Sequence, residues 1–294
     1  MTPTIALIAP GAMGAALGQC LVAHGLRVLT SLDGRSEASV MRARQAGMQA
    51  TDIDGLMQAD LLLSVVPPAE AEALAESLAP HLAASPRPPI YCDLNAVSPT
   101  TLARVEARVR AAGAEFVDGG IIGPPPSASR SPRIYVAGTQ ASRLAVLNDH
   151  GLSVIALDGP SGSASALKMC FAGINKGMTA LTTIMLLAAG RSGAGDALRQ
   201  ELAQSLPEVI SRIDSGIPDM LPKAWRWHPE MREIADFLDA CAPGHHDSAG
   251  RQTFEGFAEL YAQLGDPASR EPLQRVLMPL IDTGKSTSAG NRTR

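Results

Sequence analysis

The fold of this chain is decided by its N-terminal stretch, Ile5-Ala6-Leu7-Ile8-Ala9-Pro10-Gly11-Ala12-Met13-Gly14. The aliphatic run that ends at Ile8 is typical of a strand buried on both faces of a parallel sheet. From Gly11 the apolar positions follow a helical stripe that ends at Gly25. A strand that enters a helix through a glycine-rich turn presents backbone N–H groups to a phosphate. The stretch therefore predicts a dinucleotide-binding unit, with Ala9 in place of the first glycine of GxGxxG. Its phosphate loop contains Gly11, Ala12, Met13 and Gly14.

Short apolar runs alternate with helical patterns over the first 160 residues, which predicts an open, largely parallel, doubly wound Rossmann sheet. Residues 164–189 then form one long apolar helix, and residues 196–282 show helical patterns without a convincing strand. We predict an α/β fold in which a long inter-domain helix joins the two domains. They are an NAD(P)-binding Rossmann domain (1–160) and an all-α substrate and dimerisation domain (161–283), followed by a disordered tail (284–294). The predicted strands are 5–8, 27–32, 59–66, 89–93, 115–118, 133–136 and 153–157.

Composition argues against several classes of partner. The formal net charge of -4 and the aromatic content of 3% provide neither a dense basic patch nor many stacking side chains, so we expect no nucleic acid and no membrane as partner. The apolar run at residues 177–189 is too short to cross a bilayer. The four cysteines include no CxxC pair, and His245-His246-Asp247 is more typical of an exposed loop than of a metal site. We expect a cytoplasmic protein that binds a small-molecule substrate and no metal.

The end of the second predicted strand indicates the choice of cofactor. Enzymes that use NAD place an acidic residue about 20 residues after the phosphate loop to bind the ribose hydroxyls, whereas enzymes that use NADP offer arginine nearby. Here Arg35 is flanked by Ser31 and Ser36, which suits a 2'-phosphate, while Asp33 is the competing signal for NAD. We predict NADP as the cofactor, with NAD as the alternative.

Lys168 is the candidate for the chemistry. The chain has four lysines among its 25 basic residues, and a lysine can release its proton whereas an arginine cannot. Lys168 lies in the first turns of the long helix, just after the joint between the domains, where burial would lower its pKa. A lysine that extends to the domain surface would explain the same position without any chemistry.

The residues before Lys168 form a spaced motif, Gly159-x-x-Gly162-x-Ala164-x-x-x-Lys168. It resembles the GxxGxGxxxK signature of the β-hydroxyacid dehydrogenase superfamily, which includes 3-hydroxyisobutyrate, tartronate-semialdehyde and 6-phosphogluconate dehydrogenases. The phosphate loop with Met13 is similar to the GxGxMG loop of that superfamily. Three further segments resemble its pattern in order: Val65-Val66-Pro67 the strand end under the nicotinamide, Asp93–Pro99 the DxSTxSP segment, and Asp118–Gly123 the DAPVSGG substrate loop.

The resemblance implies roles for particular residues. Lys168 would act as general acid and base on the substrate oxygen during hydride transfer. The chain would be a divergent branch, similar to 6-phosphogluconate or 3-hydroxyisobutyrate dehydrogenase, with its own C-terminal helical domain. The candidate substrate-binding residues are Asn95, Gly120, Ile122, Gly123 and Asn175. The candidate cofactor-binding residues beyond the phosphate loop are Ser31, Arg35, Ser36, Val65, Val66, Pro67 and Asn95.

The substrate end departs from the family pattern. The asparagine pair that follows the lysine in the family is Phe171 and Ala172 here. Asn175, seven residues after Lys168 and on the same helix face, is the candidate replacement. The segment Ile121-Ile122-Gly123 stands where the family has Ser-Gly-Gly. We therefore do not transfer the sugar-phosphate substrate to this chain.

We predict an NADP(H)-preferring oxidoreductase that interconverts a hydroxyl and a carbonyl on a small polar, acidic substrate. Two alternatives share the fold: a decarboxylating dehydrogenase of the 6-phosphogluconate type, and an imine reductase, against which Lys168 counts because that group usually lacks the lysine. A non-catalytic NADP(H)-binding redox sensor is the alternative from another class. The helix at 164–189 is too apolar for one small domain to cover, so we also predict a homodimer through the C-terminal helical domain, which the resemblance implies too.

Overall fold

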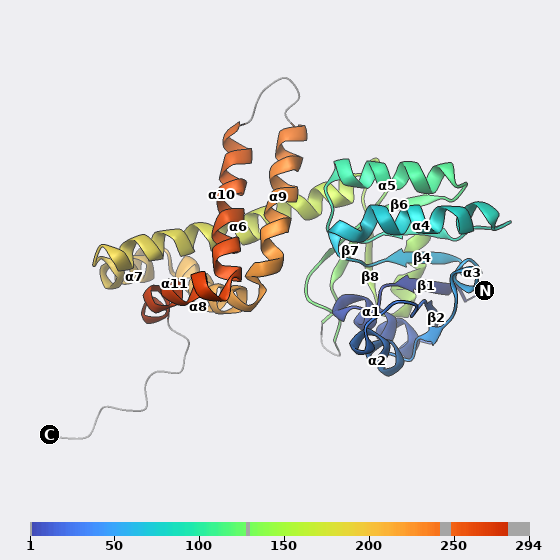
Figure 1. Cartoon of the computed structure of the whole chain (residues 1–294), viewed down its shortest axis with the longest axis horizontal. Helices are drawn as coiled ribbons and strands as arrows, with labels where there is room; N and C mark the ends of the chain where they lie inside the picture. Colours follow the sequence, from blue (N-terminus) through green and yellow to red (C-terminus); the bar gives the residue numbers. More distant parts are fainter. Residues whose placement is uncertain (1, 128–129, 242–247, 282–294) are drawn as a thin grey trace. The chain divides into compact units, whose positions relative to one another are not determined.

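The computed structural model describes residues 2–127, 130–241 and 248–281. The chain divides into two compact units, Met1–Met169 and Cys170–Arg294. The division falls within helix α6 (Ser163–Arg191), whereas the boundary predicted from the sequence is at residue 160. Strands and helices alternate in the first unit, and the described part of the second unit contains helices alone (Figure 1). The predicted fold class, a Rossmann sheet joined through a long helix to an all-α domain, is confirmed.

The first unit is built on an eight-stranded sheet. Its strand order is β3-β2-β1-β4-β5-β6-β7-β8, and all neighbouring strands are parallel except β6 and β7. The chain winds outward from β1 to β3 and then returns to the other side of β1 with β4, so the winding direction reverses between β1 and β4. The strands are β1 (Thr4–Ile8), β2 (Arg27–Thr30), β3 (Gln49–Ala50), β4 (Leu61–Ser64), β5 (Ile90–Asp93), β6 (Phe116–Ile122), β7 (Arg133–Ala137) and β8 (Ser153–Ala156).

Helices cover both faces of the sheet, and alternate residues of β1 contact different helices. Ile5 and Leu7 lie in one core with side chains of α1 and α2, whereas Ala6 and Ile8 lie in the other core with side chains of α4 and α5. Burial on both faces explains why this strand is aliphatic throughout. The helices of this unit are α1 (Ala12–Ala23), α2 (Glu37–Gln45), α3 (Ile53–Leu56), α4 (Ala71–Ala84), α5 (Pro99–Ala111), and the 3-10 helices η1 (Pro68–Glu70) and η2 (Ala141–His150).

Strand β6 is longer than the sequence predicts. The prediction ends the strand at Asp118 and treats the glycines that follow as a substrate loop, but β6 continues to Ile122. Antiparallel pairing with β7 is the reason, since Gly120 lies opposite Tyr135 in the ladder. The predicted loop is therefore wrong as far as Ile122, because pairing with a strand outside the local window overrides the glycine signal.

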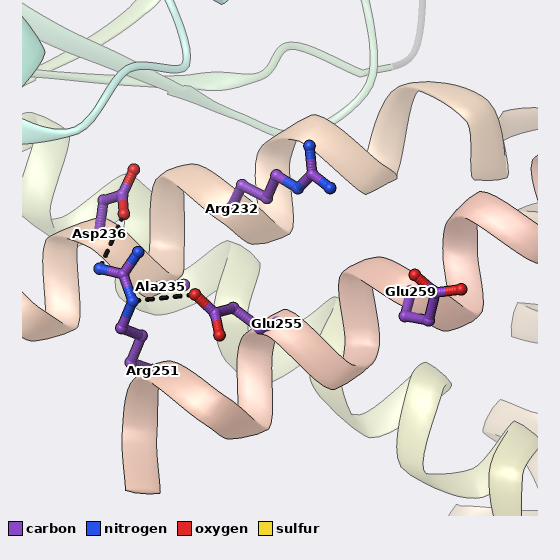
Figure 2. Close-up of a pocket in the computed structure, with 6 residues that line it drawn as sticks. All are labelled: Arg232, Ala235, Asp236, Arg251, Glu255 and Glu259. Atoms are coloured by element: carbon purple, nitrogen blue, oxygen red, sulfur yellow. Dashed lines mark hydrogen bonds and ion pairs between the residues drawn. The ribbon is translucent and has the colours of Figure 1, made fainter. Parts of the chain in front are cut away.

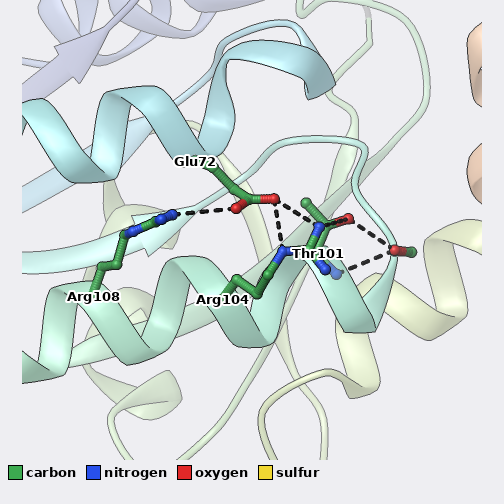
Figure 3. A network of polar contacts seen from close by, with 5 residues as sticks. Glu72, Thr101, Arg104 and Arg108 are labelled. Atoms are coloured by element: carbon green, nitrogen blue, oxygen red, sulfur yellow. Dashed lines mark hydrogen bonds and ion pairs between the residues drawn. The ribbon is translucent and has the colours of Figure 1, made fainter.

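Helices α4 and α5 are cross-linked by a charged network (Figure 3). Glu72 of α4 accepts hydrogen bonds from Arg104 at 2.8 Å and from Arg108 at 3.2 Å, both on α5. The hydrogen bond from Arg104 is the main reason why the pKa of Glu72 is lowered. Ser98 caps α5 by accepting the Thr101 N–H at 3.3 Å. Because the charged groups are partly exposed, the network stabilises this face less than the apolar core beneath it.

Asp118 fixes the beginning of α6 to the sheet. Its buried carboxylate accepts the N–H groups of Gly162 at 2.9 Å, Ala164 at 2.7 Å and Ser165 at 3.2 Å. It also accepts the Ser165 hydroxyl at 2.6 Å. The first N–H groups of a helix have no partner within the helix, so a carboxylate there stabilises the helix end. Burial nevertheless raises the pKa of Asp118, because the side chain is removed from water.

The second unit packs α10 (Ser248–Gly265) against a small-residue face of α6. A Cβ atom on Gly173 would lie 3.2 Å from the Phe254 ring, and one on Gly177 would lie 3.3 Å from the Phe257 ring, so larger side chains would push the two helices apart. The predicted tail, 284–294, lies outside the described residues. The remaining helices of this unit are α7 (Gly195–Ser205), α8 (Pro207–Met220), η3 (Leu221–Lys223), α9 (Ala224–Cys241), α11 (Pro267–Leu277) and η4 (Met278–Leu280).

Helix α6 is longer than the apolar run judged from the sequence, and within the described residues it is the one helix long and apolar enough to cross a membrane. A core helix of a soluble protein has the same length and composition. Gly173 and Gly177 pack against α10, as residues of such a core helix do. Lys168 and Lys176 would also be costly inside a bilayer. We therefore treat α6 as a packed helix of a globular protein.

Replacing Asp118 with alanine is expected to lower the free energy of unfolding by about 2–4 kcal/mol, because buried N–H groups at the start of α6 lose their acceptor. Urea unfolding measures the change. Asp158→Ala is the matched control, since Asp158 is an exposed aspartate shortly before the same helix, and we expect it to change stability by less than about 0.5 kcal/mol. Equal stabilities of the two variants would contradict the capping role.

Candidate functional site

The carboxyl ends of β1, β4 and β5 meet at the point where the winding of the sheet reverses. The Val65 N–H donates to the Ile8 carbonyl, and the Ala9 N–H donates to the Val65 carbonyl at 3.3 Å. The Leu94 N–H donates to the Ser64 carbonyl at 3.0 Å. These bonds bring together the phosphate loop and the segments after β4 and β5, which are distant in sequence. In open α/β sheets this is the place where ligands bind.

The phosphate loop has the shape that a pyrophosphate requires. A Cβ atom on Gly14 would collide with the Ala9 carbonyl, so glycine allows α1 to approach the end of β1 closely. A Cβ atom on Gly11 would have no heavy atom within 4 Å, which leaves open space beside the helix N-terminus. No side chain caps that N-terminus, and its first turn carries no acidic residue. The free N–H groups and the positive end of the helix dipole fit the phosphates of a dinucleotide.

The residues predicted to bind the ribose lie between β2 and α2. Ser31 is half-buried directly after β2, and Ser36 caps α2 by accepting a backbone N–H at 3.3 Å. The Arg35 guanidinium lies 3.9 Å from the Glu70 carboxylate, which follows β4. Arg35 is therefore near an acidic group that would oppose a second anion at the same place.

Sequence reasoning missed Arg42. Its Nε donates to the Pro10 carbonyl at 3.1 Å, and one of its Nη atoms donates to the Ser39 hydroxyl at 2.8 Å. Arg42 thereby connects α2 to the residue just before the phosphate loop. Ser39 and Arg42 are three residues apart and share one face of α2, and this spacing is the signal that could have identified them.

Asn95 clamps the ends of β4 and β5 together. Its Oδ1 accepts the Val66 N–H at 2.7 Å, and its Nδ2 donates to Ser64 and to Asp93, each at 2.9 Å. The side chain is 3% exposed, so its amide positions the backbone around Val66, in the segment predicted to lie under the nicotinamide. Burial raises the pKa of Asp93 to about 7. Direct contact of Asn95 with substrate or cofactor stays a prediction.

Lys168 lies in the second turn of α6, just after the helix end that Asp118 holds. Its Nζ donates to the Ile121 carbonyl at 2.5 Å. A Cβ atom on Gly120 would lie 3.1 Å from the Lys168 Cβ and 2.9 Å from the Ala164 carbonyl, so a glycine in β6 allows the helix to come this close. Burial lowers the pKa of the Lys168 ammonium, and among the described residues it forms no ion pair. A half-buried amine of this kind can exchange a proton.

The other residues predicted to bind substrate have different surroundings. Ile122 is 5% exposed at the end of β6. Gly123, directly after β6, has a φ of +128°, which residues with a side chain rarely adopt, so this turn requires a glycine. Asn175 belongs to the helical unit, where its Oδ1 accepts a hydrogen bond from Arg212 at 2.8 Å. Substrate binding by these residues stays a prediction.

Lys176 contacts neighbouring helices within the helical unit. It forms an ion pair with Glu230, and its Nζ lies 5.1 Å from the centre of the Trp227 ring. The Tyr261 hydroxyl donates to the Lys176 carbonyl at 2.6 Å, and the Trp227 and Tyr261 rings meet edge-to-face at 5.3 Å. The contacts connect α6 to α9 and α10, so Lys176 is engaged in packing.

A polar groove of about 500 Å³ lies between α9 and α10 (Figure 2). Arg251 lies 2.9 Å from Glu255 and 3.1 Å from Asp236, and such exposed ion pairs contribute little stability. The described residues include no group of three or more His, Cys, Asp or Glu that could hold a metal, and His245-His246-Asp247 lies outside them. The residues lining the groove are Arg232, Ala235, Asp236, Arg251, Glu255 and Glu259.

Comparisons with known proteins match both parts of the chain. Residues 4–149 match the family described as the NAD binding domain of 6-phosphogluconate dehydrogenase, and residues 189–264 match a domain of unknown function (DUF1932). A conserved protein of unknown function, whose structure is reported to be similar to 3-hydroxyacid dehydrogenases, is 27% identical with a TM-score of 0.67. The match covers 90% of this chain and 99% of that protein.

Two further solved structures share the fold at lower identity. The 3-hydroxyisobutyrate dehydrogenase of Mycobacterium tuberculosis is 18% identical with a TM-score of 0.72, covering 95% of this chain and 99% of its own. An imine reductase from Myxococcus stipitatus in complex with NADP+ is 16% identical with a TM-score of 0.56, covering 94% of this chain and 100% of its own. By its two family matches and its fold, the chain belongs to a divergent, β-hydroxyacid dehydrogenase-like branch with a C-terminal helical domain.

Proposed function

We propose that this protein is a cytoplasmic, NADP(H)-preferring oxidoreductase that interconverts a hydroxyl and a carbonyl on a small polar, acidic substrate. The observation that carries the proposal is the half-buried amine of Lys168, whose hydrogen-bond partner is a backbone carbonyl in the dinucleotide-binding unit. No carboxylate among the described residues pairs with the ammonium, and burial lowers its pKa, so the amine can serve as general acid and base.

When it is bound, the nicotinamide supplies or accepts the hydride of such a reaction. Lys168 handles the accompanying proton: the neutral amine takes it from the substrate hydroxyl, and the ammonium returns it to the carbonyl oxygen. An ammonium has three N–H groups, and one of them is used by Ile121, so two are available to substrate oxygen atoms. Because Asp118 holds the start of α6, the amine is positioned by a helix and a strand.

Support for the cofactor comes from the phosphate loop and from the residues after β2. The family match over residues 4–149 supports a nicotinamide dinucleotide. Arg35, between Ser31 and Ser36, favours NADP, because a 2'-phosphate rewards a guanidinium group and hydroxyl donors. Asp33 is exposed in the same loop and is the residue through which NAD could bind instead.

An imine reductase is the second candidate, and the fold shared with the enzyme from Myxococcus stipitatus supports it. The resemblance argues the other way, because imine reductases usually lack the lysine that stands at Lys168. A decarboxylating dehydrogenase would use the same hydride transfer and the same lysine. A redox sensor would bind NADP(H) at the same loop without turning over any substrate.

Replacing Lys168 with methionine is expected to lower kcat by about 10²–10⁴-fold and to leave the Kd for NADPH within about threefold, because methionine keeps the length of the side chain without its proton. Turnover is measured with 3-hydroxyisobutyrate, 6-phosphogluconate and 1-pyrroline. Alcohol oxidation by the unmodified protein should slow as the pH falls through the lowered pKa of Lys168, because the base must be neutral. This pH dependence should be absent from the variant.

Lys223→Met is the control for the Lys168 experiment. Lys223 is ion-paired with Asp219 in the helical unit, so its replacement should leave kcat unchanged. Unchanged turnover in Lys168→Met would refute the acid and base role. Turnover of 1-pyrroline alone would favour the imine reductase, and NADPH binding without any turnover would favour the sensor.

We propose further that the protein is a homodimer that packs along α6. Support comes from five large apolar side chains of α6 that are exposed at intervals of three and four residues. This spacing places them in one stripe, about 21 Å long, of the kind that pairs helices. A different face of α6, which carries Gly173 and Gly177, is already covered by α10. The members of this apolar seam are Phe171, Ile174, Met178, Leu181 and Met185.

The double variant Met178→Glu with Leu181→Glu is expected to convert the dimer to single chains, because burying two carboxylates in an apolar interface is unfavourable. Sedimentation equilibrium measures the mass. Met41→Glu is the control, since Met41 is 45% exposed on α2 and Leu181 is 52% exposed on α6. A mass of one chain for the unmodified protein would contradict the dimer.

A further inference from the structure

Arg42 has the position and the free charge of a phosphate ligand. Two of its N–H groups are fixed, one by the Pro10 carbonyl at 3.1 Å and the other by the Ser39 hydroxyl at 2.8 Å. The side chain is half-buried between α2 and the phosphate loop. A guanidinium has five N–H donors, so this anchored group retains donors for an anion.

The charge of Arg42 is not neutralised in the part of the chain that the structure describes. No carboxylate there forms an ion pair with it, whereas Arg35 lies 3.9 Å from Glu70. An anion that approaches Arg35 must compete with Glu70, and an anion that approaches Arg42 meets no such competitor. Arg42 is therefore less obstructed than Arg35.

We propose that Arg42 binds the 2'-phosphate of NADP(H) and so determines the preference for this cofactor over NAD(H). The inference rests on the proposed NADP(H) preference and assigns it to a residue other than Arg35. Arg42 comes from α2, the helix that follows the strand whose end receives the adenosine ribose, so the phosphate nearest to it is the one on that ribose.

Two serine hydroxyls complete a site for a phosphate monoester. The Ser36 and Ser39 hydroxyl oxygens lie 3.1 Å apart, and Ser39 in turn accepts the hydrogen bond from Arg42. The guanidinium orients the Ser39 hydroxyl, and one of the two serines donates its proton to the other, so the second serine can donate to a phosphate oxygen. The three side chains form one connected polar row from the N-terminus of α2 to Pro10.

The experiment compares Arg42→Gln with the unmodified full-length protein. Fluorescence titration gives the Kd values for NADPH and NADH, and calorimetry gives those for adenosine 2',5'-bisphosphate and adenosine 5'-monophosphate, which differ by the 2'-phosphate alone. We expect Arg42→Gln to weaken NADPH and the bisphosphate at least about tenfold and to change NADH and the monophosphate less than about threefold. Arg42→Lys should recover part of the loss, because it keeps the charge.

Arg44→Gln is the matched control, since Arg44 is an exposed arginine on the same helix, and it should leave all four Kd values unchanged. Equal weakening of NADPH and NADH by Arg42→Gln would overturn the proposal, because Arg42 would then support the loop without reading the 2'-phosphate. Unchanged binding would overturn it too. The unmodified protein tests the proposed function separately. If it binds NADH more tightly than NADPH, the NADP(H) preference is contradicted, whatever Arg42→Gln does to the ratio of the two Kd values.

Discussion

The carboxylate of Asp118 is the interaction on which the rest of the site depends. It lies on β6 beside the buried Asp93 of β5, and it accepts three N–H groups and a hydroxyl from the beginning of α6. A helix end supplies the positive partial charge that a carboxylate needs when it leaves water. The contact thus fixes the beginning of α6 against β6, and with it the direction in which the next turn of α6 presents Lys168.

Close approach of backbones is the second constraint, and glycines provide it at each joint. Gly14 allows α1 to reach the end of β1, and Gly120 allows α6 to reach β6. Gly173 and Gly177 play the same part inside the helical unit, against α10. The small residues of α6 pack against α10 within the helical unit, whereas five of its large apolar residues are exposed. The same helix therefore carries a tightly packed face and an exposed one.

Much of the fold could be predicted from the sequence because it depends on local patterns. The phosphate loop and the strand before it were recognisable from apolar periodicity and from Gly11 and Gly14. The end of β6 was not, because pairing with β7 lies outside any local window. The same distinction applies to the site. The Lys168 motif could be recognised because its residues are close together in the sequence. The hydrogen bond from the Val66 N–H to the Asn95 side chain could not be predicted in this way, because it forms only where the ends of β4 and β5 meet.

The pattern of basic residues separates structure from chemistry in this protein. Surface cations that hold helices together are mostly arginines, such as Arg104 and Arg108 beside Glu72. Of the lysines that the structure describes, Lys176 and Lys223 are paired with carboxylates. Lys168 has a carbonyl in place of a carboxylate, and a neutral acceptor stabilises the ammonium less than an anion does. Burial lowers the pKa of the Lys168 ammonium, so a proton can leave there.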